Sequence, residues 1–147
     1  MSTVISLPPR SEVKTEDTWD LSKLFADDAA WEVGLQELEA RTPGYEDFKG
    51  KLGDGATFLA ACLKYDSESE RLAERLANYA NLKMVEDQTD SNYQRLMGPL
   101  QNVATRAGEA ASFIRPEIMA IPDEVMEEFL QQPEVQLYQL LIERMVR

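Results

Sequence analysis

The 147-residue sequence contains no histidine. This absence excludes Ser-His-Asp and Cys-His nucleophile systems, histidine general bases and every metal site with an imidazole ligand. Cys62 is the single cysteine, so the chain forms no internal disulfide and lacks the thiolates of a structural zinc site. Only a metal site made of carboxylates stays open. We assign no catalytic and no metal-binding residue in this chain, and its substrate-binding residues are unknown from sequence.

Long apolar runs and basic stretches are also scarce. The longest apolar run, ATFLAACL, is far shorter than the ~20 residues that a membrane span needs. Lys and Arg number 15 against 27 Asp and Glu, giving a net charge of −12. Such a surface repels phosphate backbones and anionic membranes, and the N-terminus has no basic signal-peptide region. We expect a cytoplasmic protein that binds neither nucleic acid nor membrane.

Carboxylates are concentrated in short clusters such as ADDAAWE, SESE, VEDQTD and PDEVMEE. Clusters of this kind serve as metal or acid-base sites in some proteins, and as helix caps, first-turn residues and solvated faces in others. We interpret these clusters in the second way. Cys62 lies on an apolar helix face without a cation nearby in sequence, which predicts a buried, unreactive thiol.

The apolar residues recur at helical spacing, and no stretch shows the alternation of a strand. We therefore predict an all-α fold of about six helices, in an antiparallel bundle-like or irregular array. Residues 1–18, which include Pro8 and Pro9, are predicted to form an extended leader. Residues 19–147 are predicted to form one helical domain, and the apolar side chains of its first segment, including Trp19 and Leu21, are expected to dock on the fold.

Three helices are predicted in the first half of the domain. Asp27 or Asp28 caps the first helix, which ends near TPGYED. Asp54 is predicted to cap a short second helix, and YDSESE to open a third. The third and the following helix form a hairpin in the segment LANYANLKMVEDQTDSNYQRLMGP, whose charged hinge is either an ordinary turn or a point of contact with a ligand or another domain.

The helix after the hinge is predicted to begin at a capping box of Ser91 and Gln94. Its apolar stripe crosses Pro99 without losing phase, which predicts one kinked helix rather than two. The segment RPEIMAIP breaks the pattern. Pro122 suits the first position of the next helix, and Pro133 is predicted to begin the last.

The final segment, EVQLYQLLIERMVR, carries an apolar stripe with no Gly, Asn or Pro after it to end the helix. Leu137, Leu141 and Met145 lie on this stripe. We expect the stripe to pack against residues outside this chain, or against a second copy in a homodimer.

Four segments resemble oligoendopeptidase F, a branch of the thimet-oligopeptidase-like zinc metallopeptidases, in their order and spacing. They are TWDLSKLFADDAAWE, FKGKLGDGATFLAACL, LANYANLKMVEDQTDSNYQRL and ASFIRPEIMAIPDEVMEEFL. In the first, the resemblance rests on Trp19, Asp20, Leu21, Leu24, Phe25, Asp27, Asp28 and Trp31. In the third, it rests on Tyr79, Ala80, Glu86, Asp87, Thr89, Tyr93 and Gln94. The resemblance extends from about residue 10 to the end of the chain.

The resemblance implies a helix-rich enzyme that cleaves short peptides with one zinc, held by His-Glu-x-x-His and a downstream glutamate. These 147 residues lack that motif. The resemblance thus implies that the chain is the N-terminal, non-catalytic helical domain of such an enzyme and walls the channel that admits peptides. Its partners would be the zinc-bearing catalytic domain and short peptides. The alternative is a stand-alone acidic helical interaction module, either monomeric or dimeric.

Overall fold

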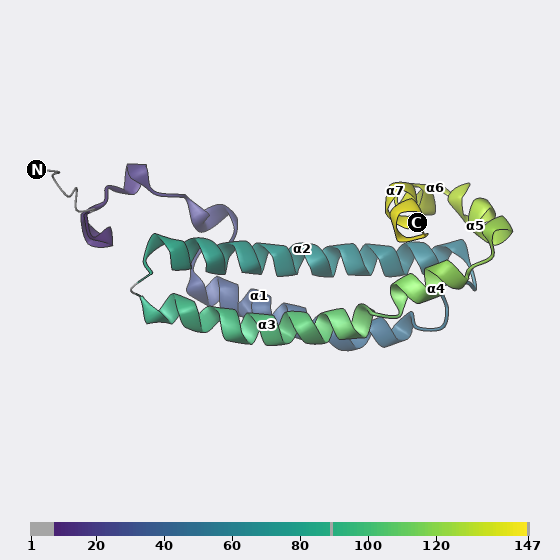
Figure 1. Ribbon diagram of the computed structural model, residues 1–147, viewed down its shortest axis with the longest axis horizontal. Helices are drawn as coiled ribbons and strands as arrows, with labels where there is room; N and C mark the ends of the chain where they lie inside the picture. The colour runs from purple at the N-terminus through teal and green to yellow at the C-terminus, as the bar shows by residue number, and fades with distance from the viewer. Residues whose placement is uncertain (1–7, 89, 147) are drawn as a thin grey trace, which may run out of the picture.

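A computed structural model describes residues 8–88 and 90–146, and every regular element in them is helical (Figure 1). The predicted all-α class is confirmed. The first seven residues of the predicted leader lie outside the described residues, as does Thr89, one of the residues on which the family resemblance rests. Within the described part, no helix combines the length and the apolar character needed to cross a membrane.

Three long helices form the body of the fold. They are α1 (Asp28–Arg41), α2 (Ala56–Glu86) and α3 (Ser91–Ala111). Consecutive helices run in opposite directions, and the 3-10 helix η4 (Thr42–Asp47) follows α1 (Figure 1). The core between them contains Leu21, Trp31, Leu38, Leu76, Tyr79, Ala80, Leu100 and Val103. The predicted α2–α3 hairpin is therefore present.

Four short helices gather at the end of the bundle where α2 begins (Figure 1). They are α4 (Ile114–Ala120), α5 (Asp123–Leu130), α6 (Pro133–Gln136) and α7 (Gln139–Val146). A second buried cluster joins them to the first half of α2 and includes Leu52, Leu59, Leu63, Ile118, Val135 and Ile142. Three short 3-10 helices lie near the other end of α2: η1 (Arg10–Glu12), η2 (Thr15–Asp17) and η3 (Leu21–Lys23).

The helix starts follow local capping chemistry. Asp27 caps α1 as predicted, because its Oδ1 accepts a 2.8 Å hydrogen bond from the Ala30 backbone. The predicted capping box at α3 is wrong. Asp90 is the capping residue, and the Gln94 side chain donates to the Gln88 carbonyl instead. The predicted cap of α2 by Asp54 is also wrong, since α2 follows Gly55 without a side-chain cap.

The predicted break at YDSESE does not occur, because α2 runs unbroken through it for 31 residues. Ser69 explains why. Its hydroxyl donates a 2.9 Å bond to the Tyr65 carbonyl one turn earlier, and also accepts one from Arg41. A serine satisfied in this way no longer competes for helix backbone groups, so its preference for helix ends is overridden. The predicted single helix across Pro99 is confirmed, since Pro99 lies inside α3.

Three further predictions need correction. RPEIMAIP does not interrupt the helices: it contains most of α4, with Pro116 in the first turn, where proline is tolerated. The predicted last helix is divided into α6 and α7 at residues 137–138. Trp19 is 58% exposed, whereas Leu21 is buried, so only the later part of that segment docks on the bundle.

Candidate functional site

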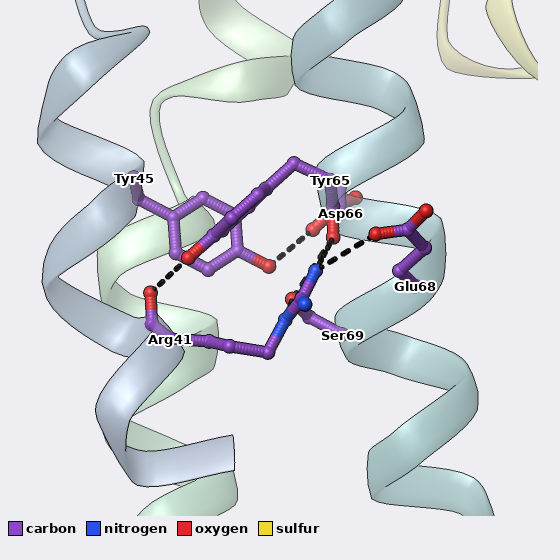
Figure 2. Close-up of polar contacts among 6 residues, drawn as sticks. All are labelled: Arg41, Tyr45, Tyr65, Asp66, Glu68 and Ser69. Carbon is purple, nitrogen blue, oxygen red and sulfur yellow. Dashed lines mark hydrogen bonds and ion pairs between the residues drawn. The ribbon is translucent and has the colours of Figure 1, made fainter. Parts of the chain in front are cut away.

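A polar cluster of six residues joins the end of α1 to the middle of α2 (Figure 2). Arg41 lies at its centre. The guanidinium donates to Ser69 Oγ (2.9 Å), to the Tyr65 carbonyl (3.2 Å) and to Glu68 Oε2 (3.2 Å). It also stacks over the Tyr65 ring, 4.5 Å from the ring centre. One arginine thus fixes three positions of α2 relative to α1.

Two tyrosines, Tyr45 of η4 and Tyr65 of α2, complete this polar cluster. The Tyr65 hydroxyl donates to the Arg41 carbonyl, and the Tyr45 hydroxyl donates a 2.8 Å bond to Asp66 Oδ1. Their rings meet edge to face, with centroids 5.2 Å apart. The aromatic and charged groups therefore hold each other in one arrangement.

Burial controls the ionisation of this region. Burial raises the pKa of Asp66, and the Tyr45 hydrogen bond partly opposes the rise. Burial is also the main cause of the raised pKa of Tyr45. Glu70, one turn after Asp66, has a raised pKa because of partial burial and then because of its neighbours Asp66 and Glu74. The carboxylates are therefore easier to protonate than ordinary ones.

A groove of about 210 Å³ lies beside this cluster, between η4, α2 and α3. One wall carries Tyr45, Asp66, Ser69 and Glu70, and the other consists of small residues of α3. Those small residues are Ala104, Ala107, Gly108 and Ala111. The small side chains of α3 leave this side of the groove open. The groove offers carboxylates and hydroxyls but no nucleophile paired with a base.

Cys62 lies on the buried side of α2 and is fully inaccessible, as predicted. Burial raises the pKa of its thiol to about 12, and the carboxylates of Asp66 and Glu117 add to the rise. A thiol in this state is a poor nucleophile.

The residues of this chain do not fit a zinc site. The sequence has no histidine, the thiol is buried, and the described residues contain no group of three His, Cys, Asp or Glu placed to hold a metal ion. We therefore derive no metal-dependent step for these residues.

Sequence reasoning missed the Arg41 cluster. The SESE segment was predicted to open a helix with capping or solvated residues, whereas Ser69 is 3% exposed and lies inside α2. No local signal marks Arg41 as a partly buried anchor, because its partners are 24 to 28 residues away in sequence.

Curated relatives share sequence over nearly the whole chain. The Bacillus subtilis oligopeptidase PepF is 38% identical over 143 residues, which are 96% of this chain and 21% of PepF. The group B oligopeptidase PepB of Streptococcus agalactiae is 27% identical over 92% of the chain and 23% of PepB. The chain is homologous to oligoendopeptidase F. No protein-family model matches it.

Solved structures agree with this homology. Oligoendopeptidase F from Enterococcus faecium superposes with a TM-score of 0.74 and 25% identity, over 82% of this chain and 24% of its own. A crystal structure from Chlamydophila abortus has the same fold over 97% of the chain, with a TM-score of 0.84 and 22% identity. The predicted resemblance is confirmed. The chain matches the N-terminal region of oligoendopeptidase F and spans about a fifth of the length of these relatives.

Proposed function

We propose that this chain is the N-terminal, non-catalytic helical domain of an oligoendopeptidase F-like zinc metalloendopeptidase, with the domain at residues 19–147 and a leader before it. The observation that carries the proposal is the match to PepF: 96% of this chain aligns with only 21% of that relative. The aligned region has two buried clusters of its own but no histidine. Zinc and peptide hydrolysis would belong to the catalytic domain of the whole enzyme.

The proposed role of the domain is to wall the channel that admits short peptides. Its shape supports this role. The 31-residue α2 spans roughly 45 Å at the rise of an α-helix, and α1 and α3 pack along it (Figure 1). The anchors at Trp31 and Arg41 hold α1 on α2. A rigid layer of three packed helices is suited to limiting, by size, which peptides enter the channel.

The test is a chimaera in which this chain replaces the matched region of Bacillus subtilis PepF. We expect the chimaera to hydrolyse a quenched short peptide and to lose that activity with a metal chelator. The chain alone should hydrolyse nothing. Chelator-sensitive hydrolysis by the chain alone would contradict the proposal, as would a folded chimaera without activity.

The wall role has a separate test in the same chimaera. A substrate-like peptide with a photoreactive group should label residues of this chain when it occupies the channel, and excess unlabelled peptide should prevent labelling. Labelling confined to the PepF portion would contradict the wall role while leaving the domain assignment in place.

We also propose a cytosolic location. The single cysteine is a buried free thiol, as is typical of proteins in reducing compartments. A proteome fractionation that placed the protein outside the cytosol would contradict it.

A stand-alone interaction module is the second candidate function. The exposed leucines at the α6–α7 turn favour it, because Leu137 and Leu140 are 79% and 61% exposed. Sedimentation of the purified chain separates the two proposals: a stable dimer supports the module, and a well-folded monomer counts against its dimeric form.

A further inference from the structure

An apolar groove of about 370 Å³ lies where the first turns of α2 meet the turn between α6 and α7. Ala60 and Ala61 of α2 line one side, and Leu137 and Tyr138 line the other. Lys64 and Glu134 contribute the charged groups among the lining residues. The groove therefore offers contact to apolar side chains rather than a polar ligand site.

A ridge of leucines continues from this groove onto α7. Leu137 is 79% exposed, Leu140 is 61% exposed and Leu141 is 37% exposed. Three large apolar side chains thus face water within five residues. Other exposed large apolar residues, such as Val33 and Met119, are distant from each other in sequence. Clustered exposure of this kind marks an interaction surface, whereas scattered exposure is ordinary.

The opposite side of the same segment is firmly anchored. Val135 is fully buried and Ile142 is 2% exposed, and both belong to the cluster that includes Leu59 and Leu63 of α2. The leucines outside are consequently held in place by the core beneath them. A surface that is formed before binding loses little conformational freedom when a partner covers it.

We propose that this groove and leucine ridge form the surface on which the remaining polypeptide of the peptidase packs. The inference rests on the proposed function and names the part of the domain that contacts the rest of the enzyme. Relatives of this chain are four to five times longer than the region matched, at 21% and 23% coverage, so such an enzyme contains ample chain to cover it. A second copy is the less suitable occupant, because two chains of charge −12 repel each other.

The experiment compares one pair of substitutions in two settings. In the isolated chain, Leu137→Glu with Leu140→Glu should leave the melting temperature unchanged, because both side chains already face water. In the PepF chimaera, the same pair should lower the melting temperature by about 4 °C or more and shorten the half-life of activity at elevated temperature about tenfold. Val33→Glu is the control, since Val33 of α1 is 64% exposed and outside the patch. It should be neutral in both settings.

Three other outcomes would contradict the inference, and one of them would also contradict the proposed function. An active chimaera that tolerates Leu137→Glu with Leu140→Glu as well as Val33→Glu would overturn the inference and leave the proposed function standing. A folded but inactive unsubstituted chimaera would overturn the proposed function, and the inference with it. A dimer of the isolated chain that the two glutamates dissociate would assign the patch to a second copy and overturn the inference.

Discussion

The indole nitrogen of Trp31 donates a 2.9 Å hydrogen bond to the backbone carbonyl of Leu76, 45 residues further along the chain. Both residues are almost fully buried, at 1% and 0% exposure. The bond joins the first turn of α1 to the middle of α2, inside the apolar cluster of the bundle. It gives a residue of the family-like segment TWDLSKLFADDAAWE a structural role, namely to set how α1 lies on α2.

Replacing this anchor should destabilise the bundle. Trp31→Phe removes the indole donor, leaves the Leu76 carbonyl without that bond and opens a cavity. We expect the free energy of unfolding to fall by about 2–4 kcal/mol. Urea unfolding followed by circular dichroism measures it. Val33→Ala, on the exposed side of α1, should change it by less than about 0.5 kcal/mol. Equal stability of Trp31→Phe and wild type would contradict the anchoring role.

Arg41 is predicted to be irreplaceable by lysine. Its planar guanidinium donates hydrogen bonds to Ser69, to Glu68 and to a backbone carbonyl at the same time. A lysine ammonium is a compact point charge and does not reproduce this planar arrangement of donors. Arg41→Lys should cost about 1–3 kcal/mol of unfolding free energy.

The matched control for Arg41→Lys is Arg106→Lys. Arg106 pairs with Glu39 at 2.6 Å on the surface, where both side chains are more than half exposed. Exposed pairs contribute about 0–1 kcal/mol. Urea unfolding of the two variants side by side is the measurement, and similar losses of unfolding free energy would show that the Arg41 cluster has no special role.

Prediction from sequence succeeded where the signal was local or repeated. The spacing of apolar residues predicted an all-α fold. The unbroken apolar stripe across Pro99 predicted a single helix there, and Asp27 was predicted to cap the start of α1. It failed where distant residues overrode local preference. The serine and acidic residues of YDSESE favour a helix end, yet Ser69 is bonded within α2 and to Arg41. Nothing within a short window reveals that partner.

The same distinction holds for the candidate site. The buried thiol of Cys62 followed from its place on an apolar face. The groove beside Asp66 and the exposed ridge at Leu137 depend on how helices are placed in three dimensions. The apolar stripe of the last segment was predicted to pack against residues outside this chain or against a second copy. In the structure, one part of the stripe is buried and another part is exposed. Met145 packs on the chain's own core, whereas Leu137 faces water.

Asp66 should give stability a measurable pH dependence. Its pKa is raised by burial above the ordinary value of 3.8, so the folded state holds a proton that the unfolded state has already lost. The contribution of Asp66 is therefore complete below the unfolded pKa and is lost as pH rises through the folded pKa. Asp66→Asn should remove this dependence of stability on pH, because asparagine does not titrate. The stability of Asp66→Asn relative to wild type should rise from pH 3 to pH 7.

Tyr45→Phe is the companion variant for this pH series. The Tyr45 hydroxyl lowers the pKa of Asp66 by hydrogen bonding, so its removal should raise that pKa further and steepen the loss of stability with pH. Urea midpoints at several pH values measure both effects. A flat difference between Asp66→Asn and wild type would contradict the assignment.

Two glycines should respond to alanine in opposite directions. A Cβ at Gly44 would lie 2.9 Å from Cζ of Tyr65, whose hydroxyl donates to the Arg41 carbonyl. Gly44→Ala should therefore displace Tyr65 and cost about 1–3 kcal/mol. A Cβ at Gly108 in α3 meets nothing within 4 Å, so Gly108→Ala should gain about 0.5–1 kcal/mol from helix propensity. Thermal unfolding of both variants tests the pair, and the same sign for both would contradict it.

Cys62 should be unreactive until the chain unfolds. Its side chain is fully buried, and its pKa of about 12 leaves almost no thiolate at pH 8. A disulfide reagent that releases a coloured thiol should therefore react with native protein only through opening of the second cluster, which Cys62 shares with Leu59 and Leu63. Reaction should become fast and stoichiometric in denaturing urea. Substitutions that loosen the second cluster, such as Leu59→Ala, should accelerate the native reaction in proportion to the population of open molecules. Rapid labelling of native wild-type protein, at the rate of a free thiol, would show that Cys62 is accessible and that this end of α2 opens far more readily than its packing indicates.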